Sequence, residues 1–131
     1  EYEKYLDKWR NLPNGNVYSL GNYYDLFKTS DLLITDCSSF LGEYFVSGKP
    51  IILLESSARI PFNDFALKLK EGMYKPKNIN EVEGIYKEVL INKNDELKPI
   101  REKIIKDNFY LPPDGIAHNI VEYLKKELRM K

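Results

Sequence analysis

Two serines and a glutamate, Ser38, Ser39 and Glu43, are the residues whose types and spacing could bind a ligand. Hydroxyl and backbone N–H groups at the start of a helix donate hydrogen bonds to a phosphate, and the positive end of the helix dipole favours an anion there. Glu43 follows Ser39 by four residues, which places it on the same helix face about 6 Å further along the axis. This offset keeps the carboxylate away from the phosphate and lets it accept hydrogen bonds from a ribose diol. The pattern indicates a site for a nucleotide.

The elements that must position these residues are a buried strand at 31–35, a helix over about 38–47 and a second buried strand at 51–54. Gly48 and Pro50 are typical of the end of a helix. The continuous apolar run IILL at 51–54 is typical of a parallel strand that is covered on both faces. Ligands of open parallel sheets bind outside the carboxyl ends of the strands, which is where residues 36–39 lie.

Strands and helices alternate along the whole chain. We expect further strands at 16–20 and 72–75, and further helices at about 2–11, 22–29, 63–70, 79–91, 95–108 and 116–129. This order predicts an α/β fold, a Rossmann-like parallel sheet flanked by helices, in a single domain of residues 1–131. The charge run at 93–107 is expected to be a solvated helix face.

Composition excludes several classes of function. Lys plus Arg and Asp plus Glu both number 20, so the chain lacks the basic surplus of a sequence-independent nucleic-acid binder. One cysteine, Cys37, permits no internal disulfide and fits a reducing, cytoplasmic compartment. The apolar runs are too short to cross a bilayer. Because His118 is the only histidine, no histidine pair can hold a metal, and we expect neither a metal nor a resident cofactor.

Two other polar positions have more than one interpretation. Asp36 is expected to be a turn or capping residue rather than a chemical group. Asp114 and Gly115 precede the last predicted helix. They either form an ordinary loop-to-helix cap or bring a second helix N-terminus towards the same cleft.

The stretch around the serines resembles the CDP-glycerol glycerophosphotransferase family, whose members polymerise teichoic acids or similar capsular polymers. That family has a strand ending in Ile-Thr-Asp, a Tyr-Ser-Ser turn, an apolar helix with an acidic residue, and Lys/Arg-Pro before another strand. The corresponding residues are Ile34-Thr35-Asp36, Cys37-Ser38-Ser39, Glu43 and Lys49-Pro50. Asp114-Gly115 with Ala117 is similar to an Asp-Gly-x-Ala segment near the family's C-terminal helix. Cys37 departs from the usual Tyr, and His118 from a small polar residue.

The resemblance implies the C-terminal, donor-binding half of a GT-B transferase that moves glycerol phosphate from CDP-glycerol to a polymer hydroxyl in teichoic acid or capsule synthesis. It implies that Ser38 and Ser39 contact the donor phosphates from one side, Asp114 and Gly115 contact them from the other, and Glu43 binds the ribose. It implies no catalytic residue in this chain, because the N-terminal acceptor domain with its His base is missing. The basic and His residues that grip the pyrophosphate and base are missing as well.

From this resemblance we expect a truncated piece that is inactive alone, whose parent enzyme lies peripherally on the inner face of the cell membrane. Any membrane contact is expected only through the parent protein. The strand that the family has near the middle of its sheet is also missing. The chain is therefore expected either to be truncated or to complete its sheet with another copy as a homo-oligomer, which its mass in solution tests.

Two alternatives stay open. Another GT-B enzyme, a nucleotide-sugar glycosyltransferase or epimerase, is separated only by the pattern Thr35-Asp36-x-Ser38-Ser39. A phosphoacceptor receiver domain would use Asp36, Ser56 or Ser57, and Lys75-Pro76. The receiver is disfavoured because only about twenty residues separate Asp36 from Ser56, too few for the intervening elements of that fold. It also needs an acidic pair for Mg²⁺ after its first strand, where this chain has Gly21-Asn22.

Overall fold

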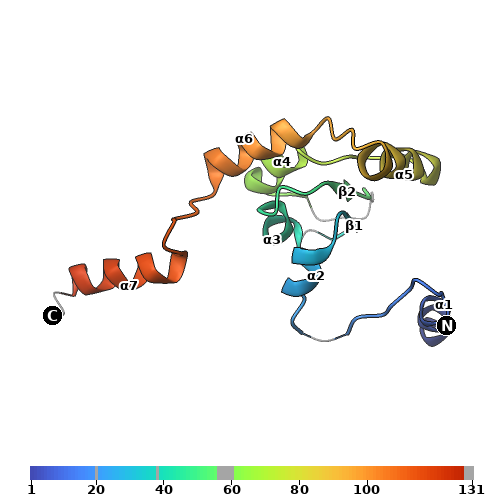
Figure 1. The fold of residues 1–131 in the computed structure, drawn as a ribbon, viewed down its shortest axis with the longest axis horizontal. Helices are drawn as coiled ribbons and strands as arrows, with labels where there is room; N and C mark the ends of the chain where they lie inside the picture. The colour runs from blue at the N-terminus through green and yellow to red at the C-terminus, as the bar shows by residue number, and fades with distance from the viewer. Residues whose placement is uncertain (20, 38, 56–60, 129–131) are drawn as a thin grey trace.

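A computed structural model of the chain describes residues 1–19, 21–37, 39–55 and 61–128. Figure 1 shows a central body of two short strands and the helices around them, with one helix lying apart at each end of the chain. The N-terminal helix α1 (Tyr2–Arg10) and the C-terminal helix α7 (Ile116–Glu127) have no buried residues. The body between them therefore contains the core and positions the candidate site.

The sheet is parallel, as the sequence predicts, but it is small. Strand β1 (Leu33–Thr35) pairs with β2 (Ile51–Leu53) in the register Leu33 to Ile51 and Thr35 to Leu53. The strand expected at 72–75 is reduced to one parallel bridge between Tyr74 and Ile52. Mixed helix and strand with a parallel sheet is thus the observed class, and completion of the sheet by another copy stays a prediction.

The strand expected at 16–20 is wrong for residues 16–19, which form no strand, and Leu20 lies outside the described residues. The physical reason is burial. Every residue of β2 is fully buried, as a covered parallel strand requires. By contrast, none of residues 16–19 is buried and Tyr18 is 43% exposed, so this segment is not covered as such a strand would be.

The expected helices are present, with shorter bounds. They are α1, α2 (Tyr24–Thr29), α3 (Leu41–Phe45), α4 (Asp64–Lys70), α5 (Ile79–Tyr86), α6 (Lys98–Asn108) and α7, and a π-helical turn, η1 (Lys87–Ile91), continues α5. Asparagine side chains cap two of them: Asn63 accepts from Ala66 N at 2.8 Å, and Asn78 accepts from Glu81 N at 3.0 Å. After α3 the chain reverses at Gly48, whose φ of 71° favours glycine and confirms the predicted stop.

The core lies where α3, α4 and α6 cover β2, and Figure 1 shows α4 and α6 together on one side of the strands. Its buried members are all apolar or aromatic. They are Leu41, Tyr44, Phe45, Ile51, Leu53, Leu69, Met73 and Ile104. Helix α3 therefore presents its apolar side to the core, as its pattern predicts, and this packing fixes the turn that precedes α3.

The charge run at 93–107 is not simply a solvated face, because Arg101 of α6 is 0% exposed. Its guanidinium donates to the carbonyl oxygens of Gly48 at 3.0 Å and Gly72 at 3.2 Å and forms an ion pair with Asp95. Asp95 also accepts a hydrogen bond of 2.8 Å from the hydroxyl of Tyr74. Since every guanidinium nitrogen has a partner, the buried charge joins α6 to the ends of α3 and α4 at a tolerable desolvation cost.

Candidate functional site

The turn between β1 and α3 is shaped by a threonine rather than by the aspartate that follows it. The hydroxyl of Thr35, the last residue of β1, accepts a hydrogen bond of 2.9 Å from Cys37 N. This hydrogen bond stabilises a tight turn directly after the strand. Asp36 and Ser39 are exposed on the turn. Ser38 lies outside the described residues, whereas Ser39 and the residues that follow it are described.

Ser39 does not cap the helix. Its hydroxyl lies 3.1 Å from the Cys37 sulfur. The N-cap position of α3 is Phe40, which has no side-chain cap hydrogen bond. Among the described residues, no side chain caps the first N–H groups of α3. With five residues, α3 is too short for a large macrodipole, so local N–H groups are the main attraction for an anion.

Glu43 lies in the first turn of α3, on an exposed surface. Its Oε2 accepts a hydrogen bond of 2.9 Å from the hydroxyl of Tyr23, the residue that precedes α2. This hydrogen bond raises the pKa of Tyr23 above its usual value, with a smaller contribution from desolvation. The carboxylate therefore has one fixed partner 20 residues away in sequence.

An aromatic cluster of Tyr23, Phe27, Phe40 and Tyr44 holds α2 against α3. The Tyr23 ring lies 5.0 Å from Phe27 and 5.0 Å from Phe40, and Phe27 meets Tyr44 edge-on at 5.1 Å. Such edge-to-face and tilted contacts are favourable beyond the area that they bury. The cluster fixes the ring of Tyr23 and, through it, the carboxylate of Glu43.

Lys49 stabilises the other end of α2. Its ammonium donates to the carbonyl oxygens of Phe27 at 3.0 Å, Lys28 at 2.6 Å and Ser30 at 2.6 Å. These include carbonyls at the end of the helix, where a cation also complements the dipole. The Lys-Pro pair of the motif thus has a structural role here that sequence reasoning missed.

A cavity of about 320 Å³ lies between α2 and α3 and includes Glu43 in its wall. Its lining combines aromatic rings, one carboxylate and two lysines. The residues are Tyr24, Phe27, Lys28, Glu43, Val46, Ser47 and Lys49. Glu43 therefore stands between the exposed turn at one end of α3 and a hollow beside the rest of that helix.

The structure does not bring Asp114 and Gly115 to this turn. Gly115 N donates to Pro112 O at 3.0 Å, and Gly115 has a φ of 86°, so these residues form a local turn before α7. Figure 1 shows α7 projecting away from β1 and α3. The ordinary loop-to-helix interpretation is the one that this arrangement supports, and His118, in the first turn of α7, is exposed.

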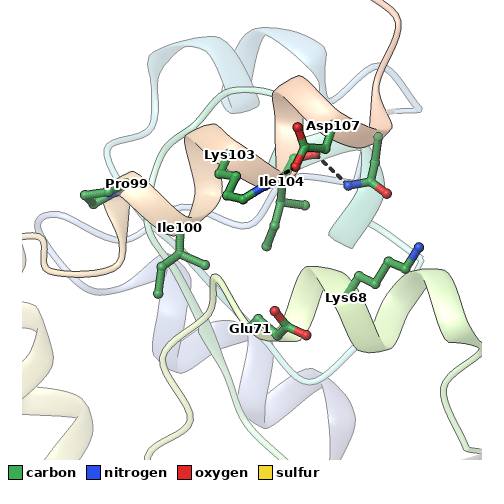
Figure 2. A pocket seen from close by; sticks show the side chains of 8 residues that line it. Lys68, Glu71, Pro99, Ile100, Lys103, Ile104 and Asp107 are labelled. Atoms are coloured by element: carbon green, nitrogen blue, oxygen red, sulfur yellow. Dashed lines mark hydrogen bonds and ion pairs between the residues drawn. The ribbon is translucent and has the colours of Figure 1, made fainter.

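A larger cavity, about 640 Å³, lies elsewhere, between α4 and α6. Figure 2 shows Lys68 of α4 and Glu71, which directly follows that helix, opposite Ile100, Lys103 and Ile104 of α6. Lys103 is ion-paired with Asp107 on the same helix, and the other wall carries one charge of each sign. This hollow has no surplus charge and no residue of the predicted nucleotide site.

Two kinds of site are not found within the described ranges. Across residues 1–19, 21–37, 39–55 and 61–128, no three His, Cys, Asp or Glu side chains are grouped so as to hold a metal ion. None of the helices placed in these ranges has both the length and the apolar character needed to cross a membrane. Compared with family models, curated proteins and solved structures, the chain gives no match.

Proposed function

We propose that this chain is the donor-binding part of a glycerophosphotransferase, which moves glycerol phosphate from CDP-glycerol to a polymer hydroxyl in teichoic acid or capsule synthesis. The observation that carries the proposal is the placement of Glu43. It lies on α3 directly after an exposed turn at the carboxyl end of β1, with one carboxylate oxygen held by Tyr23. This is where ligands of parallel sheets bind.

The proposed division of labour follows from charge. The N–H groups at the start of α3 and the hydroxyls of Ser38 and Ser39 donate to the phosphates. A carboxylate accepts hydrogen bonds and repels phosphate, so Glu43 suits the ribose hydroxyls. The proposal leaves out Asp114 and Gly115, because they form a local turn before a helix that projects away.

In the proposed reaction, the acceptor hydroxyl attacks the β-phosphorus of CDP-glycerol, the bond to the CMP oxygen breaks and CMP leaves. Positioning and charge stabilisation supply most of the catalysis in such transfers. The chain binds the donor, and a separate acceptor domain binds the polymer and supplies the catalytic base. We assign no catalytic residue to residues 1–131.

The test is a titration of the ¹⁵N-labelled chain with CMP and with CDP-glycerol, followed by NMR. Shifts should concentrate at residues 37–44. The Ser38→Ala/Ser39→Ala double variant and, separately, Glu43→Ala should each weaken binding about threefold to tenfold, the usual effect of losing a hydrogen bond. The matched control is Glu83→Ala, which removes an exposed helical glutamate elsewhere.

Each other result decides against the proposal. Affinity that is unchanged in the Ser38/Ser39 and Glu43 variants would refute the site. A response at Asp36 to Mg²⁺ with a phosphoryl analogue would favour the receiver alternative. No response to any of these ligands would leave an interaction module.

A further inference from the structure

We propose that Tyr23 is a positioning residue that holds Glu43 ready to read a ribose diol, so that the site selects ribonucleotides over deoxyribonucleotides. This inference rests on the proposed nucleotide site and names a residue outside the motif that predicts it. Tyr23 precedes α2, whereas Glu43 belongs to α3. Their hydrogen bond of 2.9 Å is a direct side-chain link between the two helices.

The carboxylate of Glu43 can accept more hydrogen bonds than the one that Tyr23 donates. An ionised carboxylate offers about four lone-pair positions on two oxygens. Tyr23 occupies one position on Oε2, and within the described part of the chain no other donor contacts the carboxylate of Glu43. The remaining positions suffice for both hydroxyls of a vicinal diol, because each hydroxyl donates one hydrogen bond.

Tyr23 also fixes the orientation of the Glu43 side chain. A glutamate on an exposed helix samples several rotamers, and fixing it on binding costs conformational entropy. Tyr23 is itself held by ring contacts of 5.0 Å with both Phe27 and Phe40. Its hydroxyl therefore meets Glu43 from a fixed position. The raised pKa of Tyr23, caused first by this bond, keeps the phenol a donor over the neutral range.

A fixed Glu43 carboxylate should favour ribonucleotides over 2′-deoxynucleotides. A fixed carboxylate binds two hydroxyls of a diol better than one, because both bonds form without further reorganisation. A site arranged to hydrogen-bond a hydroxyl discriminates against the analogue that lacks it. A 2′-deoxynucleotide retains one of the two hydroxyls and should bind more weakly than the ribonucleotide. If Tyr23 is removed, this preference should decrease.

The experiment compares CMP with 2′-deoxy-CMP on the ¹⁵N-labelled chain by NMR titration. We expect Tyr23→Phe to weaken CMP about threefold to tenfold and to weaken 2′-deoxy-CMP less, so that the ratio of the two affinities falls. The matched control is Tyr86→Phe, which removes the hydroxyl of a 44% exposed tyrosine on α5. It should leave both affinities unchanged.

A double-mutant cycle identifies the route of the effect. If Tyr23 acts through Glu43, adding Tyr23→Phe to Glu43→Ala, which removes the acceptor, should cause no further loss of CMP affinity. A purely structural role would lower the melting temperature and weaken both nucleotides equally, which would overturn the inference. An unchanged ratio in Tyr23→Phe would overturn it too. Weaker CMP binding in Glu43→Ala would still support the nucleotide site, independently of Tyr23. If the unmodified chain binds neither nucleotide, the proposed function fails and this inference fails with it.

Discussion

Replacing Arg101 with methionine should destabilise the fold more than any exposed substitution on the same helix. The Arg101 side chain is fully buried and donates to Gly48 O at 3.0 Å, to Gly72 O at 3.2 Å and to the carboxylate of Asp95. Methionine keeps most of the aliphatic stem, so the cavity created is small. The loss therefore comes from two carbonyl oxygens and one carboxylate that lose their donor.

The magnitude follows from the burial of the partners. Removing one member of a buried ion pair costs about 3–5 kcal/mol, because the other charge stays uncompensated. Asp95 is 17% exposed and keeps the hydrogen bond from Tyr74. Water and the Tyr74 hydroxyl therefore partly stabilise the unpaired carboxylate, which reduces the loss of stability. We expect the lower end, about 3 kcal/mol, which is a large part of the roughly 5–15 kcal/mol by which a domain is stable.

Urea unfolding followed by circular dichroism measures this loss. With a slope of about 2 kcal/mol per molar urea, 3 kcal/mol lowers the midpoint by about 1.5 M. The control is Lys103→Met, which breaks an exposed pair with Asp107 on α6 and should leave the midpoint unchanged. Adding Asp95→Asn to Arg101→Met should recover part of the loss, since it removes the orphaned charge. Equal midpoints for Arg101→Met and Lys103→Met would refute the reasoning.

Two further predictions concern the same region. Gly72→Ala should destabilise by about 1–3 kcal/mol through overpacking, because its Cβ would lie 2.7 Å from Arg101 Cγ. Gly84→Ala, with nothing within 4 Å of its Cβ, should be neutral or stabilising in the same urea assay; equal losses would contradict this. Burial, and then the hydrogen bond to Asp95, raise the pKa of Tyr74 above 10.0. The folded state thus holds this proton more tightly, so its contribution to stability is present below about pH 10 and is lost as pH rises through the folded pKa. Melting temperatures between pH 9 and 11 should fall less steeply in Tyr74→Phe, and identical slopes would exclude this assignment.

The local sequence pattern was sufficient to predict the helices, because apolar spacing and stop residues mark them within the segment itself. The helices from α1 to α7 were predicted within a few residues, because apolar spacing and stop signals such as Gly48 act over one or two turns. Strand pairing was predicted less well. The run 51–54 is apolar at every position, and its first three residues form the buried strand β2, whereas none of residues 16–19 is buried and they form no strand.

The candidate site shows the same division. Ser39 and Glu43 are four residues apart, so sequence alone places both near one turn, although α3 begins at Leu41 and Ser39 precedes it. Tyr23 and Lys49 were missed because each acts on a residue about twenty positions away, and no periodicity reports such a contact. Asp114 was expected as one of two alternatives, and only the position of α7 separates them.

The sequence by itself determined that helices and short parallel strands alternate here, with a polar turn after β1 and a glutamate in the helix that follows. These features depend on hydrogen bonds and side-chain spacing within a few residues. Only the tertiary structure decided that Tyr23 holds Glu43, that Lys49 binds the carbonyls at the end of α2, and that Arg101 is buried rather than solvated. Each of these depends on which distant backbone and side-chain atoms the packed core brings within hydrogen-bonding distance, and that follows from the arrangement of α2, α3 and α6 around the sheet.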